Sequence, residues 1–261
     1  MKMKELCWLL TTHCNENCGY CSKFTHLPVI TNAEYKRILE ILEQYGTKHI
    51  TFGGGEPFLT ERFDDIVRMA KQKGIHLKVV TNGDYLLEHG EILPLLDEIT
   101  LSLDSVDRQV NEKLGRGADH YSHIQQVLTY FKENRVEANI NINTVATRYN
   151  LDYIQAMIPF IKRAKIHAWR ILRFSPLRGR AARNKAEFAI SDNDFEQLKM
   201  DLKSQDVGCP YRLVDYDGMS QNYLLIAPDG NVYVPDDLKD VKVGHILEDD
   251  LKRKRKINQW I

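Results

Sequence analysis

The chain has 261 residues, 43% of them hydrophobic and 28% charged, and its 36 lysines and arginines balance 36 aspartates and glutamates. This length suits one large α/β domain with a substantial core, alone or with a small appendage. Zero net charge gives no indication of a stable nucleic-acid complex or an anionic membrane surface as partner. No apolar run approaches the ~20 residues of a membrane span, and the run over 6–10 is too short for a signal peptide, so we expect a cytoplasmic protein.

The first 175 residues alternate apolar runs with helical patterns. The apolar run over 6–10 predicts a buried strand. Thr31-x-x-Glu34 is a capping box, and the helix that it begins should end at Gly46. Pro159 should kink or shorten a later helix. We predict further strands over 49–52, 77–80, 99–103, 137–145 and 169–174, and further helices over 63–73, around 124–131 and around 154–161.

Six strands that alternate with helices predict a parallel sheet with right-handed crossovers. Such a sheet is either open and doubly wound or curved into a barrel. In both arrangements ligands bind at the carboxyl ends of the strands. The polar and glycine-rich motifs of this chain fall at those ends, so we expect the functional site there.

Residues 176–261 have a different pattern. A basic loop at 176–180 comes first, a helix capped by Ser191 follows, and two apolar runs on either side of 228–231 predict a strand–turn–strand hairpin. The basic cluster at 252–256 follows three acidic residues, which favours a charged tail over a nucleic-acid patch. We expect residues 1–175 to form the core, and residues 176–261 to form a small α/β extension that closes the active site.

Three of the five cysteines lie within eight residues, as Cys14-x-x-x-Cys18-x-x-Cys21 after the first strand. An odd total and this crowding argue against a disulfide framework and for metal binding. Thiolates suit both zinc and iron–sulfur clusters. His13 or His26 could complete a zinc tetrahedron, whereas three thiolates on a four-iron cluster would leave one iron without a protein ligand.

This cysteine pattern, with Tyr20 just before the last cysteine, resembles that of the radical S-adenosylmethionine (SAM) superfamily. The resemblance covers about the first 175 residues and implies a partial (β/α)6 barrel, similar to part of a TIM barrel. Three further elements, each after a successive predicted strand, support it. They are Gly53-Gly54-Gly55-Glu56-Pro57, Thr81-Asn82-Gly83 and Ser102-Leu103-Asp104-Ser105.

The resemblance implies one 4Fe-4S cluster held by Cys14, Cys18 and Cys21, with SAM on the open iron. An electron from a donor such as flavodoxin or ferredoxin would cleave SAM to methionine and a 5′-deoxyadenosyl radical, which abstracts a substrate hydrogen. The implied SAM-binding residues are Tyr20 at the adenine, Gly54, Gly55 and Glu56 at the methionine amino group, Asn82, and Ser102 and Arg116 at the ribose and the carboxylate.

A narrower resemblance is to viperin-like enzymes, antiviral radical enzymes that dehydrate a nucleoside triphosphate to its 3′-deoxy-3′,4′-didehydro form. The similar segments keep their order along nearly the whole chain. They are 53–59, 103–105 with 114–117, 143–150, 168–171, 188–192 and 222–226. The resemblance therefore implies a lyase that acts on a nucleotide.

The chain departs from that family where lysines grip the triphosphate, since those positions hold His49, Asn141 and Arg170. Only Arg170 keeps a fixed positive charge, and burying a triphosphate without cations is costly. Either the arginines at 178, 180 and 183 compensate, or the substrate carries fewer phosphates. The substrate-binding candidates are His49, Asn141, Asn143, Arg170, Arg178, Arg180 and Tyr223.

Two alternatives remain open. The stretch 174–181 is similar to a loop in radical enzymes that modify ribosomal peptides, although those enzymes usually carry additional cluster cysteines. A non-catalytic zinc-binding module is the alternative from a different class. An iron–sulfur protein is brown and a zinc protein is colourless, so the visible spectrum separates these classes.

Overall fold

The computed structural model describes residues 5–216, 218, 223–236 and 239–251. These residues form a curved ten-stranded sheet in the order β10-β9-β8-β1-β2-β3-β4-β5-β6-β7. Neighbouring strands from β8 through β1 to β7 run parallel, whereas β9 is antiparallel to β8 and β10. The strands are β1 (Glu5–Leu9), β2 (His49–Gly53), β3 (His76–Thr81), β4 (Glu98–Ser102), β5 (Asn139–Ala146), β6 (Ala168–Arg173), β7 (Tyr211–Val214), β8 (Tyr223–Ile226), β9 (Asn231–Asp236) and β10 (Lys239–His245).

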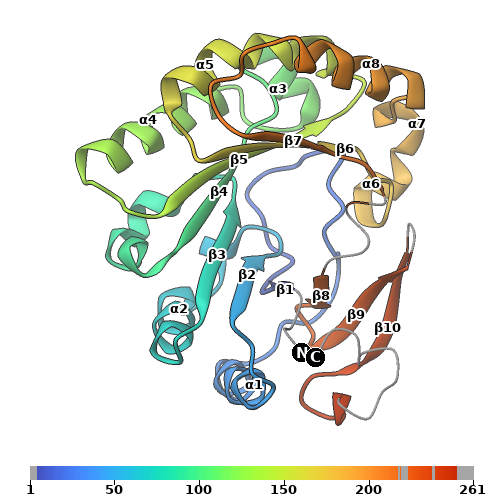
Figure 1. Cartoon of the computed structure of the whole chain (residues 1–261). Helices are drawn as coiled ribbons and strands as arrows, with labels where there is room; N and C mark the ends of the chain where they lie inside the picture. The colour runs from blue at the N-terminus through green and yellow to red at the C-terminus, as the bar shows by residue number, and fades with distance from the viewer. Residues whose placement is uncertain (1–4, 217, 219–222, 237–238, 252–261) are drawn as a thin grey trace.

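The helices cover the outer, convex side of this sheet (Figure 1). They are α1 (Asn32–Gln44), η1 (Pro57–Leu59), α2 (Phe63–Gln72), η2 (Leu86–Leu95), α3 (Arg108–Leu114), α4 (His120–Glu133), η3 (Leu151–Tyr153), η4 (Gln155–Met157), α5 (Ile158–Ala164), α6 (Gly179–Arg183), α7 (Lys185–Phe188) and α8 (Asp192–Lys203). Among the described residues, no helix combines the length and the apolar character needed to cross a bilayer.

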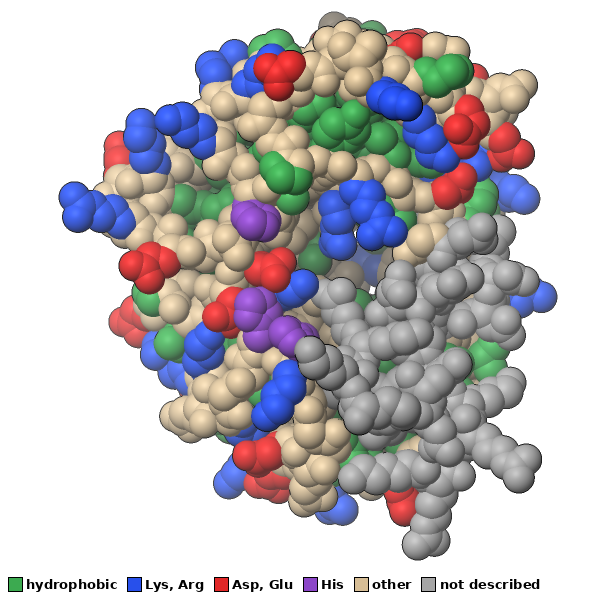
Figure 2. Space-filling view, in the orientation of Figure 1, with side chains coloured by type: hydrophobic (Ala, Val, Ile, Leu, Met, Phe, Trp, Pro, Cys, Tyr) green, Lys and Arg blue, Asp and Glu red, His purple; other side chains and the backbone are tan. Residues whose placement is uncertain are grey.

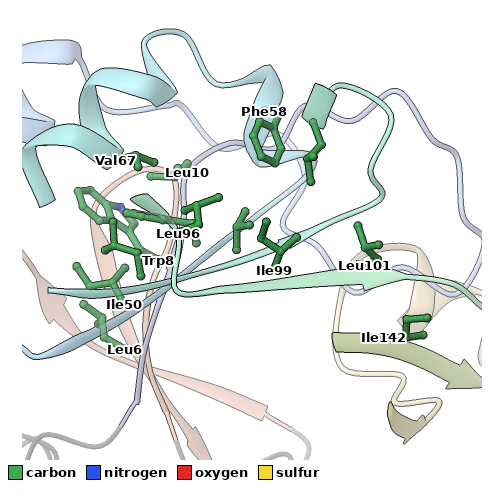
Figure 3. Packing of buried hydrophobic residues seen from close by; sticks show 14 of the residues in the cluster. Leu6, Trp8, Leu10, Ile50, Phe58, Val67, Leu96, Ile99, Leu101 and Ile142 are labelled. Atoms are coloured by element: carbon green, nitrogen blue, oxygen red, sulfur yellow. The ribbon is translucent and has the colours of Figure 1, made fainter. Parts of the chain in front are cut away.

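Alternation along the strands separates an apolar outer face from a polar inner face. Trp8, Ile50 and Leu101 point outward and are completely buried under the helices (Figure 3). Their strand neighbours point inward because successive side chains of a strand lie on opposite faces. The inner, concave face therefore carries a different set of side chains, which includes Cys7, Thr51, Lys78, Thr100, Asn141 and Arg170.

The structure confirms the partial barrel, which is open because β10 and β7 stand at opposite ends of the sheet. It also confirms the capping boxes at Thr31 and Ser191, where Glu34 and Asp194 accept hydrogen bonds from the backbone amides of the two caps at 2.6 and 3.0 Å. Pro159 shortens its helix as expected, since α5 begins only at Ile158 and the two preceding turns are 3₁₀.

Residues 176–261 differ in part from the expected pattern. The hairpin is confirmed as β8 and β9, but β7 and β10 were not predicted, and all four strands join the same sheet as β1–β6. The prediction of a basic loop is wrong from Gly179 onward, because Gly179–Arg183 forms α6. The basic cluster at 252–256 lies outside the described residues.

Candidate functional site

The three clustered cysteines lie at the carboxyl ends of the strands. The loop after β1 carries them, and its chain stays against β2 because the Leu10 amide donates to the Gly53 carbonyl at 2.9 Å. Cys14, Cys18 and Cys21 line one cavity of about 320 Å³. Its lining also contains Tyr20, Gly54, Gly55, Glu56, Asn82, Ser102 and Arg116, which are the residues that sequence motifs assigned to SAM, together with Arg178.

The glycines after β2 allow two backbone segments to touch. The Gly55 amide donates to the Thr11 carbonyl and the Glu56 amide to the His13 carbonyl, both at 2.7 Å. A Cβ on Gly55 would overlap the His13 carbonyl oxygen, and Gly54 has a φ of +134° that favours glycine. These glycines therefore fix the cysteine loop against the strand ends, in addition to any contact with a ligand.

Glu56 is buried at the wall of the cavity. Its carboxylate accepts hydrogen bonds from the Thr81 hydroxyl at 2.7 Å, the Asn82 amide at 2.9 Å and the Phe58 amide at 3.3 Å. Burial raises the pKa of Glu56 to about 7, although these three hydrogen bonds oppose the rise. A cationic amino group placed beside Glu56 would favour the ionised carboxylate.

Arg116 lies in a buried charge network beside the cysteines. Its Nη1 contacts Glu16 and its Nε contacts Asp104, both at 2.5 Å, and its side chain is 6% exposed. Burial opposes a charged guanidinium, but Asp104 and the other anionic neighbours raise the pKa of Arg116 above its ordinary value. Two of the donors of Arg116 are thus already engaged, so a SAM carboxylate would have to share this residue.

The same network includes Tyr20, whose hydroxyl donates to Asp104, and His120, whose Nδ1 lies 3.2 Å from Glu16 Oε1. Burial would raise the pKa of Glu16, yet Arg116 and His120 lower it below its ordinary value. Glu16 is therefore negatively charged. It lies between Cys14 and Cys18 in the sequence and lines the same cavity as the three cysteines.

The donor set fits an iron–sulfur cluster better than zinc. Cys18 Sγ donates to Glu16 Oε2 at 3.4 Å, and burial raises the pKa of the Cys14 and Cys18 thiols, so stable thiolates there need bound metal. His13 and His26 do not line the cavity. Among the described residues, no three His, Cys, Asp or Glu side chains converge on the position of one metal ion.

Two of the substrate candidates on the inner face, Asn143 and Arg170, are in contact, whereas Asn141 and His49 have other neighbours. Asn143 accepts a hydrogen bond from Arg170 Nε at 3.2 Å, and Asn141 donates to Glu98 at 3.4 Å. His49 is exposed at the amino end of β2, the end farther from the cysteine loop. Its ring lies 5.1 Å from the ring of His76.

The arginines after β6 are engaged differently. Arg178 pairs with Asp240 of β10 and lies over the Phe24 ring at 4.4 Å. Arg180 has a buried Nη1 with no hydrogen-bond partner among the described residues. Tyr223 begins β8, and its side chain lies outside the described part of the structure.

Several residues around the cavity and on the inner face of the sheet were not predicted from the sequence. Glu16 and Asp104 lie within the quoted motifs and could have been singled out as charges there. Alternation along the strands places Lys78 and Glu98 on the face of Asn141. The missed residues are Cys7, Glu16, Lys78, Glu98, Asp104, His120, Arg212 and Asp240.

A partial barrel with three thiols over a glycine-rich turn, at the carboxyl edge of its strands, defines a class of enzymes that hold an iron–sulfur cluster with one open iron. The family model described as "Radical SAM superfamily" matches residues 8–161. The chain therefore belongs to the radical SAM superfamily and is a radical SAM enzyme.

Curated relatives resemble the chain over most of its length. It is 28% identical over 254 residues to the S-adenosylmethionine-dependent nucleotide dehydratase of Fibrobacter sp. (strain UWH6), which covers 87% of this chain and 76% of that protein. A protein of the same name from Flammeovirga pacifica is 28% identical over 255 residues, which covers 90% of this chain and 83% of that protein. The Oncorhynchus mykiss enzyme S-adenosylmethionine-dependent nucleotide dehydratase RSAD2 is 28% identical over 207 residues, which covers 72% of this chain and 58% of that enzyme.

Solved structures share the fold at lower identity. Streptococcus suis SuiB bound to S-adenosylmethionine superposes with a TM-score of 0.72 at 19% identity, which covers 96% of this chain. This chain spans 65% of the SuiB chain. The enzyme anSMEcpe with bound AdoMet and the Cp18Cys peptide gives a TM-score of 0.71 at 18% identity, which covers 98% of this chain and 82% of that one. These likenesses establish the fold alone.

Proposed function

We propose that this radical SAM enzyme dehydrates a nucleotide to its 3′-deoxy-3′,4′-didehydro form. The observation that carries the proposal is the similarity to S-adenosylmethionine-dependent nucleotide dehydratases along most of the chain. The polar inner face supports it, because Asn141, Asn143 and Arg170 offer amides and a guanidinium to a sugar and a phosphate. An antiviral role in the cytoplasm is part of the same proposal.

Cys14, Cys18 and Cys21 would hold the 4Fe-4S cluster, and the cavity residues from Tyr20 to Arg116 would hold SAM. When bound, these cofactors supply a 5′-deoxyadenosyl radical once an electron donor such as flavodoxin or ferredoxin delivers an electron. The chain orients the substrate hydrogen toward that radical and excludes water from it. Arg178 and Asp240 contribute to this exclusion, since both side chains are largely buried where the β9–β10 hairpin meets the cysteine loop.

The test is anaerobic reconstitution of the full chain with iron, sulfide, SAM and a strong reductant. We expect brown protein, and we expect one class of nucleoside mono-, di- or triphosphate to raise 5′-deoxyadenosine formation and to lose one water, as seen by mass spectrometry. Cys18→Ser should abolish both signals, whereas Cys209→Ser, outside the cavity, should abolish neither. The proposal is wrong if no nucleotide raises SAM cleavage above the background.

A peptide modifier is the second candidate, because SuiB bound to its precursor peptide SuiA also shares this fold, with a TM-score of 0.76. At 19% identity that likeness extends to the fold and no further. Outside the clustered three, the chain has only Cys7 and Cys209, too few for a second cluster of the usual four thiolates. A peptide encoded beside the enzyme would raise SAM cleavage in the same assay if this candidate were correct.

A further inference from the structure

Two arginines face each other on neighbouring strands of the inner face. Arg170 of β6 is the register partner of Arg212 of β7, so both side chains project from the same face. Both residues are exposed. Like charges directly opposite on adjacent strands destabilise a sheet. The pair therefore carries a cost that a bound anion would remove.

Neither guanidinium is neutralised by the residues that the structure describes. Arg170 Nε donates to the neutral Asn143 side chain at 3.2 Å, and no described carboxylate forms an ion pair with Arg170 or Arg212. Other cations nearby are paired. Lys78 lies 3.2 Å from Glu98, and Arg173 lies 2.6 Å from Asp192.

The pair continues a row of side chains that starts at the cysteine cavity. Strand register aligns Ser102, Asn143, Arg170 and Arg212 across four neighbouring strands. Ser102 lines the cavity. With strands spaced ~4.8 Å apart, Arg170 lies about 10 Å and Arg212 about 14 Å from Ser102 along this row. Figure 2 shows Lys and Arg side chains gathered in the hollow of this face. A ligand that begins at the cavity can thus extend over Asn143 to the two arginines.

The two positive charges of Arg170 and Arg212 match a single phosphate group better than a chain of phosphates. Two guanidiniums complement the two negative charges of one phosphate monoester, and each can donate two parallel hydrogen bonds to it. Farther along the inner face, Lys78 is already neutralised by Glu98, and the Glu98 carboxylate would repel additional phosphates. His49 and Asn141 supply no fixed positive charge.

We infer that Arg170 and Arg212 together bind the single phosphate group of a nucleoside monophosphate substrate, and that Arg212 is a specificity-determining residue. This inference rests on the proposed function for the identity of the ligand. β7 lies after residues 8–161, the segment that the superfamily model matches. If the inference is correct, this strand takes a direct part in substrate selection.

The test measures binding to the reconstituted holoenzyme by titration calorimetry, with the mono-, di- and triphosphates of the four ribonucleosides and with inorganic phosphate. Arg212→Gln should weaken binding of the preferred monophosphate by at least about tenfold, because it loses charge-assisted hydrogen bonds. Arg212→Lys should recover part of the affinity through its charge. Arg37→Gln, on the exposed side of α1, removes the same charge elsewhere and should leave the affinity within about twofold.

Thermal unfolding provides a second measurement and shows that the variant folds. Without phosphate, Arg212→Gln should melt at or above the wild-type temperature, since the repulsion is gone. Added monophosphate should raise the wild-type melting temperature more than that of the variant. Unchanged affinity in Arg212→Gln would overturn the inference, as would a triphosphate that binds about tenfold or more tightly than the monophosphate.

These outcomes are separate from those of the proposed function. Arg212-dependent binding without nucleotide-stimulated SAM cleavage would support the phosphate site and contradict nucleotide dehydration. If nucleotides stimulate SAM cleavage and Arg212→Gln remains fully active and binds them tightly, nucleotide dehydration is supported and the phosphate site is contradicted.

Discussion

Arg116 forms ion pairs with two buried carboxylates, those of Glu16 and Asp104. Replacing it by Met would leave Glu16 and Asp104 buried without their cation, and an uncompensated buried charge typically costs about 3–5 kcal/mol. We expect Arg116→Met to lower the free energy of unfolding of the cofactor-free protein by roughly that amount in urea titrations. Arg108→Gln is the matched control, because the Arg108–Asp119 pair is exposed and should change stability by at most about 1 kcal/mol. Equal losses in both variants would show that the buried network is not structural.

The pKa of Glu56 makes stability depend on pH. Burial raises its pKa from 4.5 to about 7 in the folded protein, so the neutral carboxyl is favoured by folding. This contribution is complete below pH 4.5 and is lost as the pH rises through about 7. We expect the wild-type free energy of unfolding to fall relative to Glu56→Gln over this range, by a total on the order of 3 kcal/mol.

The comparison uses cofactor-free protein, because a bound ammonium group would change the pKa of Glu56. Subtracting the Glu56→Gln curve from the wild-type curve removes the titration of all other groups. Parallel curves from pH 4.5 to 7 would mean that folding leaves the pKa of Glu56 at its ordinary value.

Among the elements, the turn between β2 and η1 can pack against the cysteine loop only because residue 55 is glycine. A side chain there would overlap the His13 carbonyl oxygen, so Gly55→Ala should displace the cysteine loop. We expect a several-fold lower iron content per chain after reconstitution, measured by iron analysis and by visible absorption. Gly117→Ala is the control, since a Cβ at Gly117 meets no atom within 4 Å, and it should reconstitute like the wild type. Full iron loading of Gly55→Ala would contradict a scaffolding role for this turn.

The elements that sequence patterns revealed are those with strong local signals. Strands β1–β6 carry apolar residues at alternating or consecutive positions between helical segments, and the helices α1 and α8 have capping boxes. In contrast, β7 has only four residues, and β10 is rich in charged side chains, so neighbouring strands rather than local preference make them strands.

The same distinction applies to the site. The cysteines and the glycine-rich turn are compact motifs, which made the cavity lining predictable. Arg212 faces Arg170 only through strand register, and Asp240 meets Arg178 across 62 residues of sequence. Contacts of this kind require the three-dimensional fold.

At the scale of the whole molecule, the β9–β10 hairpin reaches back to the cysteine loop. The ring of Tyr233 lies 5.3 Å from that of Phe24, and burial raises the pKa of Asp240 even though Arg178 opposes the rise. We propose that this contact closes the active site. Asp240→Asn should weaken it, so oxygen should bleach the cluster several-fold faster in stopped-flow absorption measurements.

Lys242→Gln is the control for this prediction, because Lys242 lies on the same strand and is exposed. Its cluster should bleach at the wild-type rate. If Asp240→Asn bleached no faster than Lys242→Gln, the hairpin would have no part in protecting the cluster.

The pairing of β1 with both β2 and β8 also bears on how the protein is assembled. β2, one neighbour of β1, ends at residue 53, whereas β8, the other neighbour, begins only at residue 223. Contacts between such distant segments form late, because closing a long loop is entropically costly. During synthesis the cysteine loop therefore leaves the ribosome well before β8–β10, the strands that lie beside it in the folded protein. The three thiols are thus synthesised, and can be exposed to solvent, before β8–β10 complete the sheet beside them.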